Sequence, residues 1–141
     1  ADLVYLDPPY NQHSYLGNYH IWESLVLWDK PDTYGLAHKR VDTKENKSEF
    51  NGKRKAYPAM AKVIENISNN TKRAVVSYSN EGYVDYSDML TLLASYGRTV
   101  VVEVDYKRYV GAVIGVYNDK GVKVGKPTHT ENKEYIFVTD F

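Results

Sequence analysis

The chain has 141 residues, a length typical of one domain, and 43% of them are hydrophobic, which is enough for an ordinary core. Its 18 basic and 18 acidic residues cancel, which excludes a histone-like polycation and confines any contact with nucleic acid to local patches. The sequence has no Cys and no apolar run near the roughly 20 residues of a membrane span, so we expect a cytoplasmic protein without disulfides or thiolate chemistry.

The first predicted element is an apolar strand at residues 3–6, which ends at Asp7-Pro8-Pro9. Such runs fit strands covered on both faces, as in parallel sheets, and the prolines must end the strand. Because no turn, initiating Met or leader precedes it, we expect the chain to be a fragment.

Two helices and a basic segment are expected next. Asn18 can cap a helix with apolar residues at helical spacing, namely Ile21, Trp22, Leu25 and Trp28. Residues 30–55 show little periodicity, and residues 38–55 hold seven Lys or Arg against three acidic residues, so we expect a mobile basic loop. The second helix should carry Pro58 in its first turn, end at Asn69-Asn70 and present Tyr57, Met60, Ala61, Ile64 and Ile67.

Strands dominate the remainder. Residues 74–78 and 99–104 are predicted strands on either side of a third helix, which Ser87 can cap and Gly97 can close. Residues 109–117 and 135–139 also read as extended, with a turn at residues 118–121. This order predicts an α/β sheet that is mostly parallel, with strands 3–6, 74–78 and 99–104 as neighbours and an antiparallel strand at the edge.

Asp7-Pro8-Pro9-Tyr10 occupies the carboxyl end of a strand, where open α/β sheets bind their ligands. A bare Asp-Pro-Pro is an ordinary strand terminator. The full tetrapeptide, however, would occur by chance in about one in a thousand chains of this length. The motif therefore indicates a functional site.

The tetrapeptide matches the signature of amino-methyltransferases, and residues 7–20 resemble the Dam-type (alpha-group) DNA adenine methyltransferases of restriction-modification systems. Residues 77–82, Ser-Tyr-Ser-Asn-Glu-Gly, are similar to the strand end beside the catalytic loop of that family. The resemblance implies a Rossmann-like sheet of which residues 1–141 supply the second half with its C-terminal antiparallel hairpin. It also implies S-adenosylmethionine as cofactor, double-stranded DNA as substrate and a cognate restriction endonuclease as a partner.

The chain departs from this family by having no Phe-x-Gly-x-Gly turn before Asp7. We therefore expect the cofactor-binding turn and the target-recognition region to lie upstream of residues 1–141. The isolated chain should be inactive, bind S-adenosylmethionine feebly, and self-associate through the unpaired edge at residues 3–6.

The chemistry of an amino group explains the residue types. The lone pair of adenine N6 is delocalised into the ring until two acceptors hold its protons, and Asp7 and the Pro8 carbonyl can supply them, with Pro9 helping to fix the backbone. Tyr10 offers an aromatic face to a flipped base. Asp7 would also border the cofactor site.

Other residues keep a structural and a functional interpretation. Tyr19 resembles the aromatic-rich helix start that follows the family signature. Ser79 and Asn80 fit either an ordinary strand-end turn or the lining of the site. Two groups of basic residues fit either solvated surface or contacts with DNA: Lys39, Arg40, Lys53 and Arg54 in the loop, and Lys107 and Arg108 further along the chain.

No metal site is expected, because the four histidines lack ligand spacing: His13, His20, His38 and His129. Two alternative functions stay open. One is an amino-methyltransferase that acts on RNA or a protein amide, and the other is a DNA-binding fragment without catalysis.

Overall fold

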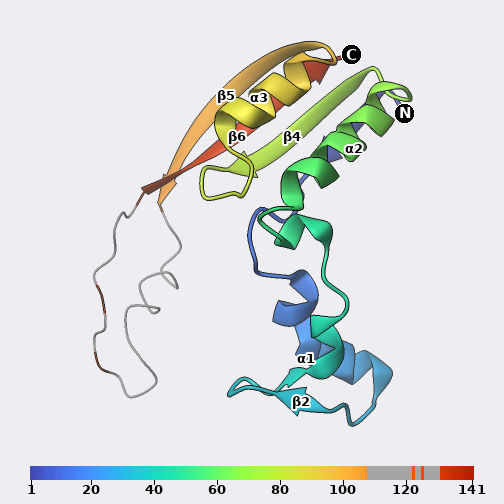
Figure 1. The fold of residues 1–141 in the computed structure, drawn as a ribbon, viewed down its shortest axis with the longest axis vertical. Helices are drawn as coiled ribbons and strands as arrows, with labels where there is room; N and C mark the ends of the chain where they lie inside the picture. The colour runs from blue at the N-terminus through green and yellow to red at the C-terminus, as the bar shows by residue number, and fades with distance from the viewer. Residues whose placement is uncertain (108–121, 123–124, 126–130) are drawn as a thin grey trace.

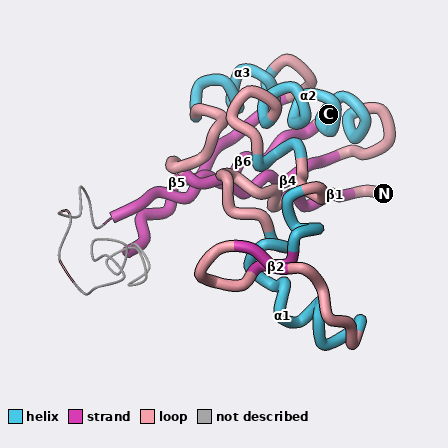
Figure 2. The backbone as a smooth tube through the Cα atoms, turned by 60° about the horizontal axis from the view of Figure 1, so that its bottom comes forward, coloured by secondary structure: helices cyan, strands magenta, loops and turns pink. Residues whose placement is uncertain are grey.

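The computed structural model describes residues 1–107, 122, 125 and 131–141 (Figure 1). Arg108, His129 and the predicted elements at residues 109–117 and 118–121 lie outside the described residues. The main body is a four-stranded sheet of β1 (Leu3–Leu6), β4 (Arg73–Ser79), β5 (Arg98–Lys107) and β6 (Glu131–Asp140). Two helices, α2 (Ala56–Ser68) and α3 (Tyr86–Ala94), cover one face of this sheet (Figure 2).

The strand order is β1-β4-β6-β5, which corrects the expected topology. β1 and β4 are parallel, but β6 lies between β4 and β5 and is antiparallel to both, so most pairings are antiparallel. The prediction that residues 99–104 lie beside residues 74–78 is wrong, as is the placing of the antiparallel strand at the edge. The crossover through α3 leaves room for one strand between β4 and β5, and β6 satisfies the hydrogen bonds of both.

The antiparallel pairing of the C-terminal strand is confirmed, and it has a consequence for the site. Since β6 opposes both β4 and β5, these two strands run in the same direction as β1. Their carboxyl ends therefore meet at one edge of the sheet.

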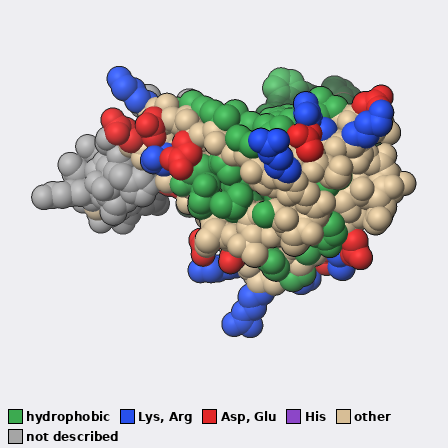
Figure 3. Space-filling model, turned by 90° about the horizontal axis from the view of Figure 1, so that it is seen from above, with side chains coloured by type: hydrophobic (Ala, Val, Ile, Leu, Met, Phe, Trp, Pro, Cys, Tyr) green, Lys and Arg blue, Asp and Glu red, His purple; other side chains and the backbone are tan. Residues whose placement is uncertain are grey.

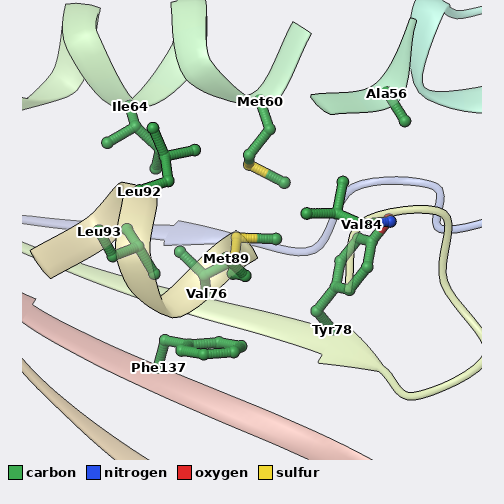
Figure 4. Close-up of a cluster of buried hydrophobic side chains, with 10 residues drawn as sticks. All are labelled: Ala56, Met60, Ile64, Val76, Tyr78, Val84, Met89, Leu92, Leu93 and Phe137. Carbon is green, nitrogen blue, oxygen red and sulfur yellow. The ribbon is translucent and has the colours of Figure 1, made fainter. Parts of the chain in front are cut away.

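The core lies between the sheet and the two helices (Figure 4). Along β4 the alternate residues Ala74, Val76 and Tyr78 are buried, as expected of a strand with one covered face. Above them pack helix residues at helical spacing, and Phe137 of β6 completes the layer; the helix residues are Met60, Ile64, Met89, Leu92 and Leu93. The predicted second helix and the strand at residues 74–78 are thus confirmed.

The opposite face of the sheet is not covered by any described helix. Leu3 and Tyr5 are 55% and 62% exposed, so the expectation that residues 3–6 form a strand covered on both faces is wrong within the described residues. Apolar β5 residues of the same face are also exposed, namely Val100, Val102 and Val104. Seen from above, hydrophobic side chains reach the surface between charged ones (Figure 3).

Two helices begin at other residues than predicted. The N-terminal residue that caps α1 (Tyr15–Leu27) is Ser14, not Asn18, because the Ser14 hydroxyl accepts from the Gly17 amide at 3.0 Å. The N-cap of α3 is Asp85, not Ser87. In both cases an earlier polar residue is the N-cap, so α1 is four residues longer at its start than predicted and α3 two residues longer.

Residues 14–48, hereafter the arm, project beneath the sheet in Figure 1. They comprise α1, the antiparallel pair β2 (Thr33–Tyr34) and β3 (Lys39–Arg40), and the 3-10 helix η1 (Val41–Lys44); a second 3-10 helix, η2 (Glu49–Asn51), leads back to α2. The expected loop at residues 30–55 therefore contains short regular elements, while its mobility stays a prediction. No helix among the described residues is long and apolar enough to cross a membrane.

The arm is held by a buried arginine. Arg40 is only 4% exposed. Its guanidinium donates to both carboxylate oxygens of Asp29 at 2.6 and 2.9 Å, to Asp42 at 2.9 Å and to the Ser24 hydroxyl at 3.2 Å. These bonds join the end of α1 to the hairpin.

Candidate active site

The motif Asp7-Pro8-Pro9-Tyr10 leaves the carboxyl end of β1, next to the carboxyl end of β4. Two hollows border it, and no residue lines both. The first, of about 220 Å³, is mostly apolar and is lined by Tyr5, Leu6, Asp7, Pro8, Phe50, Met60 and Val63. The second, of about 290 Å³, is more polar and is lined by Pro9, Tyr10, Asn11, His13, Tyr15 and Asn18. Successive residues of the motif thus face two different environments.

Tyr10 is packed by an aromatic neighbour from β4. Its ring meets that of Tyr78 edge-on, with centroids 6.4 Å apart. Burial raises the pKa of the Tyr10 phenol, and the nearby Tyr106 and Glu134 raise it further. Tyr10 therefore stays neutral at physiological pH and presents an uncharged aromatic ring.

The four residues 10–13, hereafter the motif loop, are held from two distant segments. The amide of Asn51, at the end of η2, donates to the carbonyls of Asn11 at 2.8 Å and His13 at 3.3 Å. The backbone N–H of Tyr83 donates to the Tyr10 carbonyl at 2.9 Å. In addition, the Tyr83 hydroxyl donates to Gln12 Oε1 at 2.9 Å.

The turn after β4 approaches the motif closely. Gly82 packs so tightly on Tyr78 that a Cβ there would lie 2.2 Å from the ring carbon Cε1. Only glycine fits this contact, which places Tyr83 beside Tyr10. The structure thus brings the Ser-Tyr-Ser-Asn-Glu-Gly segment next to the Asp-Pro-Pro-Tyr motif.

Ser79 and Asn80 make local contacts. The buried Ser79 hydroxyl accepts from the Glu81 amide at 3.3 Å. Asn80 makes two hydrogen bonds to the backbone of Lys133 in β6. The side-chain Oδ1 of Asn80 accepts from the Lys133 backbone N–H at 3.1 Å, and the backbone N–H of Asn80 donates to the Lys133 carbonyl at 3.0 Å. These bonds shape the turn and dock β6, in line with the strand-end interpretation.

The predicted basic and aromatic contacts are spread over the surface. Lys53 and Arg54 are exposed between η2 and α2, Lys39 is half-buried in the arm, and Lys107 is exposed at the end of β5. Arg40 differs from them, because its guanidinium faces inward to Asp29 and Asp42. Tyr19 is 57% exposed and stacks on Tyr15 with centroids 6.4 Å apart.

Among the residues that the structure describes, no group of three or more His, Asp or Glu side chains is arranged to hold a metal ion. Sequence reasoning assigned no role to Asn51 or Tyr83. Asn51 lies 40 residues from Asn11, and Tyr83 lies 71 residues from Gln12, so no spacing pattern links them to the motif.

Comparison with known proteins gives one family. Residues 1–81 match the model of the D12 class N6 adenine-specific DNA methyltransferases. No solved structure is significantly similar.

Three curated relatives are methylases or methyltransferases by name. The chain is 35% identical to the modification methylase StsI of Streptococcus sanguinis over 112 residues, and 33% identical to the type II methyltransferase M.FokI of Planomicrobium okeanokoites over 112 residues. It is 31% identical over 119 residues to the type II methyltransferase M.CviAII of Paramecium bursaria Chlorella virus 1. These matches cover 77%, 77% and 84% of this chain, but only 17%, 17% and 35% of the relatives.

Proposed function

Because the chain belongs to the D12 class N6 adenine-specific DNA methyltransferase family, we propose that the complete protein transfers a methyl group from S-adenosylmethionine to the N6 amine of an adenine in double-stranded DNA. The observation that carries this proposal is the placement of Asp7-Pro8-Pro9-Tyr10 at the shared carboxyl edge of β1 and β4. The sheet would be the second half of a Rossmann-like domain. Three strands of one direction, whose carboxyl ends share an edge, support that proposal.

The motif supplies the two acceptors that the amine needs. The Asp7 carboxylate accepts a hydrogen bond from one N6–H and the Pro8 carbonyl accepts one from the other, so the nitrogen lone pair is freed for attack in line with the methyl, and one proton leaves N6 once the methyl is bound. The two prolines fix the backbone, so the carbonyl keeps its direction during the reaction. Tyr10 then stacks on the flipped base, worth about 1 to 3 kcal/mol.

The apolar hollow beside Asp7 suits part of the cofactor. Phe50, Leu6 and Val63 offer apolar surface for an aromatic ring, and the Asp7 carboxylate borders the same hollow, where it would face a cation. When bound, S-adenosylmethionine would supply an electrophilic methyl group on its sulfonium. At about 220 Å³ the hollow is smaller than the roughly 300 to 1,000 Å³ of most ligand sites, so it would hold only part of that molecule.

DNA would lie against the polar hollow and contact exposed basic residues of the arm, of the segment between η2 and α2, and of the end of β5. We assign phosphate contacts to Lys39, Lys53, Arg54 and Lys107 and a base or sugar contact to Tyr19, since each keeps an exposed or half-exposed side chain. Arg40 is left out of this set because it is paired internally. The names of the relatives, a modification methylase and a type II methyltransferase, support a role in a restriction-modification system. The partner that we propose for that role is a cognate endonuclease that attacks unmethylated sites.

Methyl transfer by the complete protein tests the proposal. Asp7→Ala should lower transfer to duplex DNA by at least about 100-fold, because it deletes an acceptor used most in the transition state. Tyr10→Ala should lower it less, and Tyr10→Phe should keep much of the rate. Asp88→Ala serves as the control, since Asp88 is an exposed residue in the first turn of α3.

Three other outcomes would change this proposal. Wild-type turnover by Asp7→Ala would reject the mechanism. Methylation of RNA or of a protein amide in preference to DNA would change the substrate class. DNA binding without transfer to any of these acceptors would leave a binding module.

A further inference from the structure

We infer that Asn51 and Tyr83 are positioning residues for the motif loop, a role that rests on the function proposed above. The loop joins β1 to α1 and belongs to neither, so no ladder of backbone hydrogen bonds fixes it. Its geometry depends on side chains and turns from elsewhere in the chain.

Asn51 fixes the second half of the loop. Its single amide group bridges the carbonyls of Asn11 and His13, which are two residues apart. The Asn11 side chain closes the same turn by accepting from the His13 amide at 2.9 Å. The next residue, Ser14, caps α1, so Asn51 also sets where the arm begins.

Tyr83 fixes the first half from the opposite end of the sequence. Its backbone N–H holds the Tyr10 carbonyl, and its hydroxyl holds the Gln12 side chain. With Asn51, it gives every residue of the loop at least one hydrogen bond to a segment outside the loop. The position of Tyr10 is thereby set by the turn after β4 and by η2 together.

This arrangement should matter for rate more than for binding. Tyr10 and the Pro8 carbonyl must align one amine with one methyl, and a misplacement of about 1 Å can cost on the order of 100-fold in rate. A looser loop would still meet the cofactor and DNA. Loss of a positioning residue therefore lowers kcat and leaves KM for both substrates nearly unchanged.

The first experiment changes Asn51 in the complete protein. Asn51→Ala and Asn51→Asp both remove the donor and should lower kcat by about 10- to 100-fold, whereas Asn51→Gln keeps an amide and should retain more of the rate. Asn69→Asp is the matched control, because the Asn69 amide also donates to a backbone carbonyl, that of Glu65 at 2.9 Å, but far from the motif. Equal kcat values for Asn51→Ala, Asn69→Asp and wild type would overturn the role of Asn51.

The second experiment is a double-mutant cycle on Tyr83 and Gln12. Tyr83→Phe and Gln12→Ala each break the same hydrogen bond, so each should lower kcat by about 3- to 10-fold and the double variant by no more than either. Additive losses would mean that the Tyr83 hydroxyl does not act through Gln12 and would overturn this half of the inference.

Hydrogen exchange separates the inference from the proposed function. The backbone N–H of His13, which donates to Asn11 Oδ1, should exchange faster in Asn51→Ala than in wild type or Asn69→Asp, whatever the substrate of the enzyme. If the wild type methylates no DNA adenine while this exchange still rises, the proposed function fails and the positioning role stands. If the wild type is active and neither exchange nor kcat responds, the positioning role fails alone.

Discussion

The sheet and the arm are stabilised by opposite kinds of contact. Buried residues of the sheet body are mainly apolar side chains from α2, α3, β4 and β6. The fully buried residues of the arm are small or polar, namely Gly17, His20, Arg40 and Thr43, whereas most apolar residues of α1 are exposed and its C-cap Trp28 is 84% exposed. A packed apolar core is cooperative, whereas a buried charge network stabilises only the segments that it joins. The motif loop therefore connects an apolar core to an extension that is held separately by polar contacts.

The largest effect is expected in the core. Phe137→Ala removes a fully buried ring from the centre of the sheet and should lower the free energy of unfolding by about 3 to 5 kcal/mol. Val26→Ala in α1, where the side chain is 81% exposed, should change it by no more than about 0.5 kcal/mol. Urea denaturation of the complete protein measures both. A similar loss for the two variants would contradict the contrast between the sheet and the arm.

A smaller, local effect is expected from Arg40→Met. The change removes the link between Asp29, Asp42 and the hairpin, so protease cleavage within residues 28–44 should become faster while the sheet stays folded. Arg73→Met is the control, since Arg73 pairs with Asp140 at the sheet instead. Global unfolding of Arg40→Met would show that the arm is part of the core.

The pH dependence of the arm has a definite sign. Hydrogen bonds from Arg40 lower the pKa of Asp29 and of Asp42. A carboxyl whose pKa is depressed by folding contributes stability above its unfolded pKa, about 3.9, and loses it as the pH falls through the folded value. Protection of residues 28–44 against proteolysis by an acid-tolerant enzyme should therefore be constant from pH 7 to 5 and decline below about pH 4. In Arg40→Met this decline should disappear.

The smallest effect concerns DNA. Lys53→Gln with Arg54→Gln should weaken binding of all sequences alike and reduce the slope of log affinity against log salt by about 2, without a change in stability. Arg40→Gln should loosen the arm but leave the slope of log affinity against log salt unchanged, because Arg40 is paired with Asp29 and Asp42. A salt slope unaltered by the Lys53 and Arg54 changes would return these residues to ordinary solvated surface.

Local patterns predicted much of the body and little of the arm. The spacing of Met60 and Ile64 and the apolar run around Val76 describe elements whose burial follows from one periodic face. The insertion of β6 could not be predicted, because pairing of Val76 and Val101 with Phe137 depends on long-range register. The arm depends on an ion pair between Arg40 and Asp29, and ion pairs have no periodic signature.

In the candidate site, too, the contiguous residues could be predicted from the sequence and the long-range contacts could not. The Asp-Pro-Pro-Tyr motif is contiguous, so its position at a strand end could be predicted directly. Its supporting residues could not, since Asn51 and Tyr83 each act through two hydrogen bonds to carbonyl oxygens of residues far away in the sequence. The cap of α1 was ambiguous for a related reason: Ser14 and Asn18 are both good caps, and only the bond to Gly17 selects between them.

The strand order also affects synthesis of the protein on the ribosome. β4 and β5 each pair with residues 131–140, so while the chain has been made only up to residue 130, β4 is paired with β1 on one side alone and β5 has no partner strand. Until that segment emerges, both strands present open edges from which another chain could add a strand. Residues 131–140 therefore act as a closing step, and the nascent protein is most exposed to aggregation just before they appear.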